Sequence, residues 1–309
     1  MIFDYAIEPE VMAEWSIDRQ IAGSIIYQFC YGNPKILAKY PENWVEHIFR
    51  TICKLGTNIS QSQRKTAELF LDSIRKNCFL LKKSFPFDDG KTWFANVNEY
   101  IPASTSTTIV SKEQTVHQNW LHTTCINDIE PNELWHRDGG IVFERTPENI
   151  THALEPILQN ASFLIFVDPY LDFHSTEIKQ SFQKIFEFLC SNRDKLPECI
   201  EWHCNFERGP RLVAFEEKCR QFRFRSKSGF KLDFYRWKEN SKSGDEFHDR
   251  FLLCEYGGIV LGKGFAAGAP GQTSDANTMG KAQWQKRWEQ FYYKKWDDNP
   301  VDMPTSMEK

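Results

Sequence analysis

Apolar residues recur at helical spacing through much of the first 85 residues. Segments 13–31, 43–55 and 60–77 each place apolar residues three or four positions apart, which is typical of amphipathic helices. The third segment opens on Ser60-Gln-Ser-Gln, which has the spacing of a capping box. The pattern therefore predicts a helical N-terminal region over residues 1–85.

The pattern changes to short, strand-like runs between residues 86 and 157. Runs rich in β-branched and aromatic residues at 92–95, 106–110 and 140–144 predict strands. Thr146 and Pro147 then predict the start of a helix that ends near residue 159. We interpret 86–157 as a mixed α/β connecting region, with a decayed copy of the domain that follows it as an alternative.

The pattern of residues 158–298 alternates between buried strands and amphipathic helices. The run Phe163-Leu-Ile-Phe-Val is apolar throughout, as in a strand buried on both faces of a sheet. Helices are then predicted at 177–190 and 212–222, and strands at 199–204, 231–237, 251–254 and 258–261, the last two as a hairpin. The predicted class is α/β (α+β overall), with a mixed-sheet C-terminal domain after the helical N-terminal region.

Two segments near the C-terminus lack a periodic pattern. Residues 266–277 are mostly small, which predicts a mobile lid or a linker. Residues 284–296 predict an aromatic, basic helix, and 299–309 predict a disordered tail.

Length and composition limit the number of domains, the cellular compartment and the cofactors that we expect. With 309 residues, 41% of them hydrophobic, the chain is long enough for two packed domains, and no run approaches the length of a transmembrane helix. The N-terminus has no basic region ahead of an apolar one, so no signal peptide is expected. Nine cysteines without a C-x-x-C pair indicate free thiols in a reducing cytoplasm. The group Cys199, His203 and Cys204 has no familiar zinc spacing, so we expect no metal and no cofactor.

Chemistry-bearing residues gather around the predicted hairpin. His248 and Arg250 stand two positions apart, so they point to the same side of an extended chain, an arrangement suited to an anion such as phosphate. Glu255 follows, and the second strand ends in Gly262-Lys263-Gly-Phe265. Upstream, Asp168 and Asp172 follow the strand at 163–167. They lie where ligands of open α/β sheets gather, or Asp168 and Pro169 simply begin a turn.

This spacing resembles the H-x-K-x4-D-x6-G-S-x-N motif of the phospholipase D superfamily, over about residues 158–268. The resemblance implies that His248 is the nucleophile, that Arg250 and Lys263 hold phosphate, and that Glu255 orients a histidine, without a metal. Phe265 stands at the motif's Asn position. The H-x-R form is most similar to the phospholipase D-like domain at the C-terminus of MIT-domain proteins, which implies a branch in which the fold binds phosphate groups and catalysis is lost.

A single motif copy leaves two functions open. The superfamily needs two histidines, so the first is a metal-independent nuclease that works as a homodimer, by analogy with bacterial defence nucleases. The alternative is an inactive module that binds nucleic acid, a phosphorylated ligand or a partner protein. The N-terminal helices are a candidate surface for a protein partner.

A basic segment precedes the motif and predicts a nucleic-acid surface. Its cations alternate with aromatic residues, which suits a polyanion with stacked bases. The same alternation fits an ordinary half-buried strand whose aromatic residues are core and whose cations are solvated. The candidate nucleic-acid-binding residues are Arg220, Arg223, Arg225, Lys227, Lys231, Arg236 and Lys238.

Overall fold

The chain forms two compact units. The computed structural model describes residues 2–294, apart from 84, 103–106, 115–116, 124–125, 138, 173–174, 192, 194–195, 207–212, 214–216, 218–230 and 238–247, and only the backbone of 57 and 231–232. The N-terminal domain comprises Ile2–Asp138, and the C-terminal domain comprises Gly139–Lys309. The division falls inside the region 86–157, which the sequence pattern suggests is one segment.

A parallel sheet forms the centre of the N-terminal domain. Its five strands have the order β3-β2-β1-β4-β5, and each neighbouring pair is parallel. The region predicted to be helical thus also holds three strands. The strands are β1 (Phe3–Ile7), β2 (Lys35–Lys39), β3 (Leu80–Lys82), β4 (Thr108–Ser111) and β5 (Trp120–His122).

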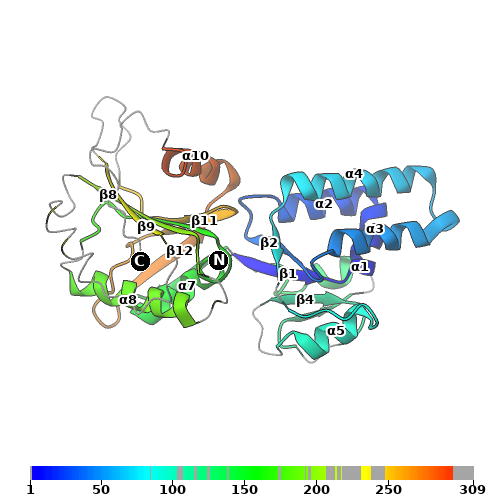
Figure 1. Ribbon diagram of the computed structural model, residues 1–309, viewed down its shortest axis with the longest axis horizontal. Coiled ribbons are helices and arrows are strands. Elements are labelled where there is room, and N and C mark those ends of the chain that lie inside the picture. The colour runs from blue at the N-terminus through cyan, green and yellow to red at the C-terminus, as the bar shows by residue number, and fades with distance from the viewer. Residues whose placement is uncertain are drawn as a thin grey trace. The chain divides into compact units, whose positions relative to one another are not determined.

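Helices cover both faces of this sheet (Figure 1). Tyr5 and Leu37 pack with the first four helices, whereas their neighbours Ala6 and Ala38 pack with α5. The predicted helix 13–31 is two helices, because Asp18 adopts an extended backbone and caps the second. The helices are α1 (Pro9–Ile17), α2 (Arg19–Phe29), α3 (Trp44–Leu55), α4 (Gln61–Asn77) and α5 (Trp93–Tyr100), with the short η1 (Gly56–Asn58) and α6 (Ile126–Ile129). The predicted capping box at Ser60 is confirmed.

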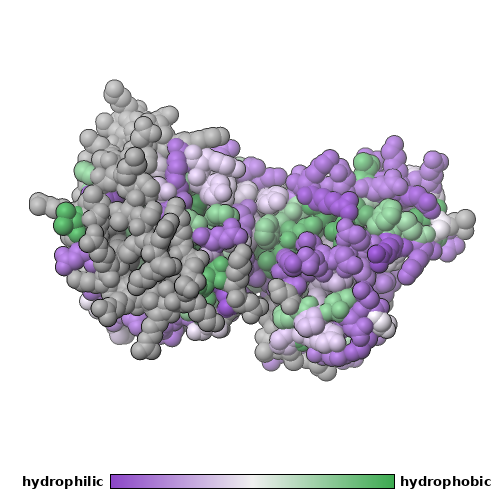
Figure 2. Space-filling model, in the orientation of Figure 1, coloured by the Kyte–Doolittle hydropathy of each residue, from purple (hydrophilic) through white to green (hydrophobic). Residues whose placement is uncertain are grey.

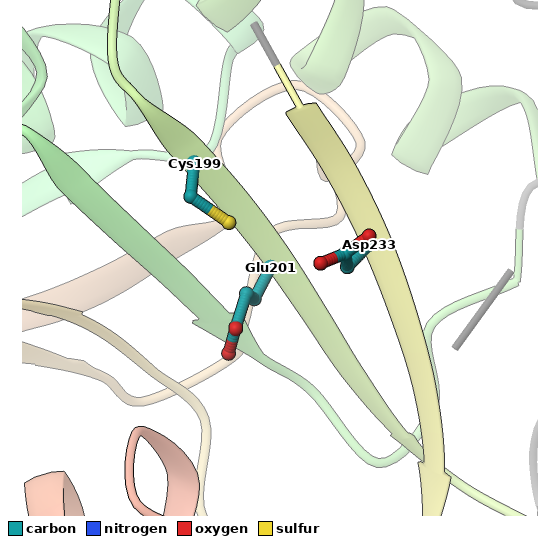
Figure 3. A group of neighbouring side chains, drawn as sticks. All are labelled: Cys199, Glu201 and Asp233. Carbon is teal, nitrogen blue, oxygen red and sulfur yellow. The ribbon is translucent and has the colours of Figure 1, made fainter. Parts of the chain in front are cut away.

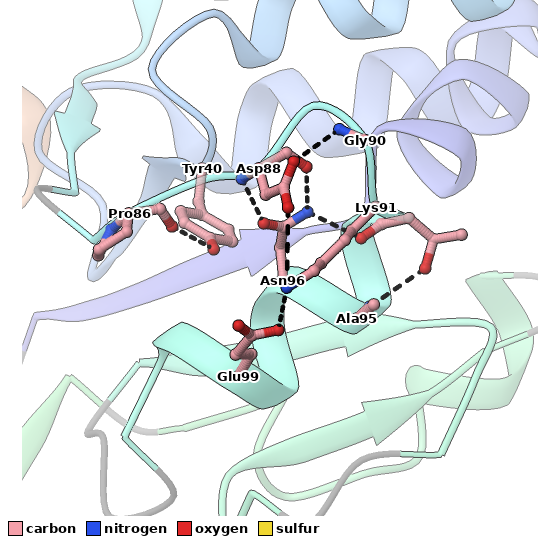
Figure 4. Close-up of polar contacts among 9 residues, drawn as sticks. Tyr40, Pro86, Asp88, Gly90, Lys91, Ala95, Asn96 and Glu99 are labelled. Atoms are coloured by element: carbon pink, nitrogen blue, oxygen red, sulfur yellow. Dashed lines mark hydrogen bonds and ion pairs between the residues drawn. The ribbon is translucent and has the colours of Figure 1, made fainter.

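One buried amide fixes the segment before α5 (Figure 4). Asn96 accepts a hydrogen bond from the Asp88 N–H (2.6 Å) and donates to the carbonyl oxygens of Asp88 (2.9 Å) and Thr92 (3.0 Å). The Tyr40 hydroxyl donates a hydrogen bond to the Pro86 carbonyl oxygen (2.9 Å). The Thr92 hydroxyl caps α5, so the prediction of a strand at 92–95 is wrong.

A mixed sheet forms the centre of the C-terminal domain. Its order is β6-β12-β11-β10-β7-β8-β9; β7, β8 and β9 are parallel, and the other neighbours are antiparallel. The strands are β6 (Gly140–Glu144), β7 (Phe163–Val167), β8 (Cys199–Asn205), β9 (Lys231–Trp237), β10 (Phe251–Cys254), β11 (Gly257–Leu261) and β12 (Thr273–Thr278). The predicted strands and the hairpin of this domain are confirmed.

Two predictions for the flanking segments are corrected by this topology. The stretch 266–277, predicted as a lid or linker, contains most of β12, which pairs with β6 on one side and β11 on the other. The alternative of a decayed repeat at 86–157 is wrong, because β4 and β5 belong to the parallel N-terminal sheet and β6 belongs to the mixed C-terminal sheet.

Helices α7 and α8 lie on one face of the mixed sheet, and α10 lies on the other (Figure 1). Trp202 packs on Phe182 of α8, whereas the next residue, His203, packs edge-to-face with Phe291 of α10. The helices are α7 (Pro147–Asn160), α8 (Thr176–Ser191) and α10 (Lys281–Phe291). The predicted helix 212–222, apart from two isolated positions, and the predicted disordered tail lie outside the described residues. None of the described helices is long and apolar enough to cross a lipid bilayer.

Candidate functional site

Four side chains meet where β7 ends and β10 begins. Antiparallel pairing of Val167 with Phe251 sets the next residues, Asp168 and Arg250, beside each other. The Arg250 Nε lies 3.6 Å from the Asp168 Oδ1, and the guanidinium carbon lies 4.9 Å from the centroid of the Tyr170 ring. The Tyr170 hydroxyl in turn makes a long contact, 3.5 Å, with Nδ1 of His248. Register thus joins the two motif residues to a second segment 78 or more positions away.

Asp168 is a buried carboxylate that fixes the geometry of this group. It is 4% exposed, and it accepts hydrogen bonds from the backbone N–H groups of Tyr170 (3.0 Å) and Phe265 (3.4 Å). Burial raises the pKa of Asp168, against the opposing effects of the Tyr170 N–H and the Arg250 charge. Asp168 thus accepts a hydrogen bond within the turn after β7, as the turn interpretation predicts, and it also contacts Arg250. Its role at a ligand site stays a prediction.

Gly264 lies directly against the side chains of Asp168 and Arg250. Its φ is +73°, a conformation that favours glycine. A Cβ at this position would lie 2.4 Å from Asp168 Oδ2 and 2.5 Å from Arg250 Cδ. Phe265 turns away into the aromatic core, 5.4 Å from the Phe166 ring. Neither Gly264 nor Tyr170 was predicted as a site residue; the proximity of Tyr170 to Asp168 in the sequence is the one signal that pointed to it.

Lys263 lies at the same end of the hairpin as His248. The Leu261 N–H donates to the Arg250 carbonyl (2.8 Å), which extends the hairpin pairing by one residue toward Lys263. The Lys263 side chain is exposed, and its backbone N–H donates to the Ser274 hydroxyl (3.1 Å). Its ammonium group forms no ion pair with any residue that the structure describes.

Glu255 does not orient His248, contrary to the expectation from the motif. It follows the far end of β10, and its carboxylate accepts hydrogen bonds from the N–H groups of Ser162 (2.8 Å) and Phe163 (3.2 Å). Burial raises the pKa of Glu255. The side chain therefore closes the start of β7, at the opposite end of this strand from the histidine.

The basic segment is only partly described. Arg220, Arg223, Arg225, Lys227 and Lys238 lie outside the described residues, as does the side chain of Lys231. Arg236 is contrary to expectation: it is 6% exposed, its guanidinium carbon lies 4.5 Å from the Phe206 ring centroid, and Nη2 donates to the Phe206 carbonyl (3.1 Å). Arg236 is therefore a packing residue, and Phe234 and Trp237 beside it are core.

A second group of polar side chains forms a network on the face of the mixed sheet that α10 covers. Trp237 Nε1 donates to His203 Nδ1 (2.8 Å); because Trp is only a donor, the ring proton is on Nε2, which donates to Glu201 (3.1 Å). Glu201 also pairs with Lys294. Burial lowers the pKa of His203 to about 4. Burial alone would raise the pKa of Glu201, but His203 and Lys294 together lower it.

Three residues of this side are metal-ligand types (Figure 3). Cys199 and Glu201 are two positions apart on β8, and Asp233 of β9 pairs with Glu201. One ligand atom of each residue lies within 4.8 Å of the ligand atoms of the other two. The Glu201 carboxylate is already paired with the Lys294 ammonium and His203. We therefore interpret this group as part of the ion-pair network that holds the end of α10 on the sheet.

The N-terminal domain has a cavity of about 430 Å³ at the carboxyl ends of β2 and β3. Both of its lysines are paired, Lys82 with Glu42 (2.7 Å) and Lys83 with Asp4 (2.6 Å), so neither offers an uncompensated charge to an anion. The cavity is lined by Pro41, Glu42, Asn43, Lys82, Lys83, Phe85, Phe87 and Asp89.

Large apolar side chains are exposed on the helices of this domain. Tyr27, Phe49 and Leu69, on α2, α3 and α4, are 75%, 49% and 59% exposed. Figure 2 shows hydrophilic side chains over much of the visible face of the domain, interrupted by hydrophobic ones. A protein partner for these helices stays a prediction.

Comparisons with known proteins do not assign a family. No family model and no curated protein matches the sequence. A solved structure of TrmBL2, an archaeal chromatin protein reported to show a novel mode of DNA binding, matches with a TM-score of 0.26 and 12% identity. The match covers 57% of this chain and 59% of that chain, less than two thirds of its length. At this TM-score the similarity supports no conclusion about function.

Proposed function

We propose that the C-terminal domain, as a phospholipase D-like fold, binds the phosphate groups of nucleic acid at the carboxyl end of β7. One observation carries the proposal. Arg250 is held at Nε by Asp168 and against the Tyr170 ring, and its side chain is 27% exposed. Its two terminal nitrogens contact no other polar group in the described part of the chain. A guanidinium fixed in this way is preorganised for a two-pronged contact with phosphate oxygens.

The neighbouring groups add to this binding surface. Lys263 contributes an exposed ammonium, and His248 contributes a half-buried imidazole beside the Tyr170 hydroxyl. Tyr170 is 41% exposed, so its ring can contact a base or sugar next to the bound phosphate. Three cationic or hydrogen-bonding side chains beside one exposed aromatic ring favour a nucleic acid over a small inorganic anion.

Salt-dependent binding tests this proposal. Labelled single-stranded DNA and RNA are titrated with the full chain at several salt concentrations. Arg250→Ala and Lys263→Ala are each expected to weaken binding and to lower the slope of log K against log salt by about 1. Lys281→Ala, another exposed lysine of the same domain, is the matched control and retains the wild-type slope. Unchanged slopes in both site variants would refute phosphate binding here.

A second candidate is phosphodiester hydrolysis with His248 as nucleophile. It is favoured by the contact of the Tyr170 hydroxyl with Nδ1, which orients the imidazole next to the arginine that packs on the same tyrosine ring. A homodimer would supply the second histidine as general acid, and this association stays a prediction. Cleavage of DNA and RNA in EDTA is compared between wild type, His248→Ala and His152→Ala, an exposed histidine of α7. Hydrolysis requires cleavage that only the first variant loses; its absence in wild type leaves binding alone.

A further inference from the structure

Two cysteines of the N-terminal domain face each other across an isolated antiparallel β-bridge. Cys30 follows α2 and Cys78 follows α4. The Tyr31 N–H donates to the Asn77 carbonyl (3.0 Å), a hydrogen bond between the residues that flank the bridge. The cysteines are therefore a non-hydrogen-bonded pair, whose Cα atoms typically lie about 4.5 Å apart with side chains on the same side. Protein disulfides span Cα separations of about 4.4–6.8 Å, so the pair meets the backbone requirement.

The two thiols differ in access. Both are reduced in this structure; Cys30 is half-buried, whereas Cys78 is 2% exposed. The Cys30 thiol donates to the Tyr27 carbonyl (3.3 Å), and the Asn33 side-chain amide donates to the sulfur (3.2 Å). These contacts hold Cys30 at the surface end of the pair. A small disulfide in solution can therefore reach Cys30 before it reaches Cys78.

We propose that Cys30 and Cys78 form a reversible disulfide by exchange with a low-molecular-weight disulfide such as oxidised glutathione. The Cys30 thiolate attacks one glutathione sulfur, which forms a mixed disulfide and releases one glutathione thiolate. The Cys78 thiolate then attacks the Cys30 sulfur and releases the second glutathione. The two cysteines lose two electrons and two protons in total, and one oxidised glutathione becomes two reduced molecules.

The cross-link acts on the helical layer of the domain. It joins the C-terminal ends of α2 and α4, which pack against each other, and the loop that it closes, from residue 30 to residue 78, contains β2, α3, η1 and α4. A covalent loop of this size restricts the unfolded chain far more than the folded one. Oxidation is therefore a modification that stiffens the N-terminal domain and that a thiol reductant reverses.

The test uses the full chain in glutathione buffers of increasing oxidised fraction, followed by alkylation, intact mass and peptide mapping. Wild type is expected to yield a peptide that joins residues 30 and 78. Its N-terminal unfolding midpoint is expected to rise by roughly 10 °C and to return after reduction. Cys53→Ser, which removes an exposed thiol of α3, behaves as wild type.

Two variants separate the two exchange steps. Cys78→Ala is expected to retain one glutathione on Cys30, and Cys30→Ser is expected to remain unmodified at Cys78. In wild type, a stable mixed disulfide without the cross-linked peptide would overturn the proposal, and so would two unreacted thiols at high oxidised fraction. The wild-type peptide map alone decides the question if a variant does not fold.

Discussion

Substitution of Gly264 by alanine tests whether the site is as closely packed as its contacts indicate. The added methyl group would meet Asp168 Oδ2 at 2.4 Å and Arg250 Cδ at 2.5 Å. Asp168 cannot move away cheaply, because it is buried and bonded to the N–H groups of Tyr170 and Phe265. The variant must therefore displace the carboxylate, the arginine or the turn itself.

The expected cost has two parts, and a second glycine separates them. Placing a side chain at φ +73° costs about 1–2 kcal/mol, and overpacking a well-filled region costs a further 1–3 kcal/mol or so. Gly271 has φ +81°, and an added methyl group there would have no atom within 4 Å, so Gly271→Ala incurs only the first cost. The entropy that alanine removes from the unfolded chain is the same for both variants and cancels in the comparison. Gly264→Ala should thus be the less stable of the two by about 1–3 kcal/mol.

Urea unfolding of both variants measures this difference, and the nucleic-acid titration described above measures its effect on the site. Gly264→Ala is expected to weaken binding, because it displaces the carboxylate that holds the Arg250 guanidinium. Gly271→Ala is expected to bind as wild type. Equal stabilities of the two variants, within about 0.5 kcal/mol, would show that the packing around Gly264 yields freely and would refute the reasoning.

Three further predictions concern buried polar groups. Glu255→Ala removes the acceptor for two backbone N–H groups and should destabilise the C-terminal domain by about 2–4 kcal/mol in urea unfolding, whereas Glu255→Gln should cost less; equal losses would contradict the capping role. Burial lowers the pKa of His203 to about 4 in the folded state, against about 6.5 when unfolded, so its contribution to stability is expected to be complete above pH 6.5 and to be lost as pH falls toward 4, by about 3 kcal/mol in total. His203→Gln, which can still accept from Trp237 and donate to Glu201, should remove that part of the pH dependence of unfolding; an unchanged profile would rule the histidine out as its source. Asn96→Asp sets a carboxylate oxygen against two carbonyl groups and should lower the stability of the N-terminal domain by about 2–4 kcal/mol, and an unchanged melting curve would show that the Asn96 amide does not fix the segment before α5.

Elements with a long local period could be predicted from the sequence. In α4 the buried residues Ala67, Phe70, Leu71 and Ile74 form one apolar stripe, which is visible without any knowledge of what covers it. The strand Phe163–Val167 was predicted for a similar reason, because it is apolar on both faces. Such signals lie within a few consecutive residues, so distant partners do not alter them.

The N-terminal sheet could not be predicted in this way. Its first two strands each contain a charged residue that is buried only because a distant group compensates it. Asp4 accepts from Thr107 (2.7 Å) and pairs with Lys83 (2.6 Å). Lys35 bonds to Gln28 (2.6 Å) and lies 4.0 Å from the Trp135 ring centroid. The local sequence shows only a short run that contains a charged residue. The partner that allows this residue to be buried in a strand comes from a distant part of the fold.

Strand β12 illustrates a related difficulty. Its sequence, Thr273-Ser-Asp-Ala-Asn-Thr278, has no apolar run, yet Ser274 and Ala276 are buried while the residues next to them on the strand face outward. Pairing with strands on both sides, rather than side-chain hydrophobicity, stabilises this segment. Small residues without an apolar run are typical of a flexible loop, so the sequence alone predicts a loop here.

The site itself depends on a register that the sequence does not contain. The spacing of His248, Arg250 and Glu255 along one segment suggested that all three serve one centre. Antiparallel pairing of β10 with β7 instead sends the two ends of that segment to opposite ends of the partner strand. Arg250 meets Asp168 at one end, and Glu255 meets the backbone of Ser162 at the other. The same pairing therefore explains both why Arg250 and Asp168 meet where β7 ends and why the Glu255 carboxylate supports the fold rather than orienting the histidine.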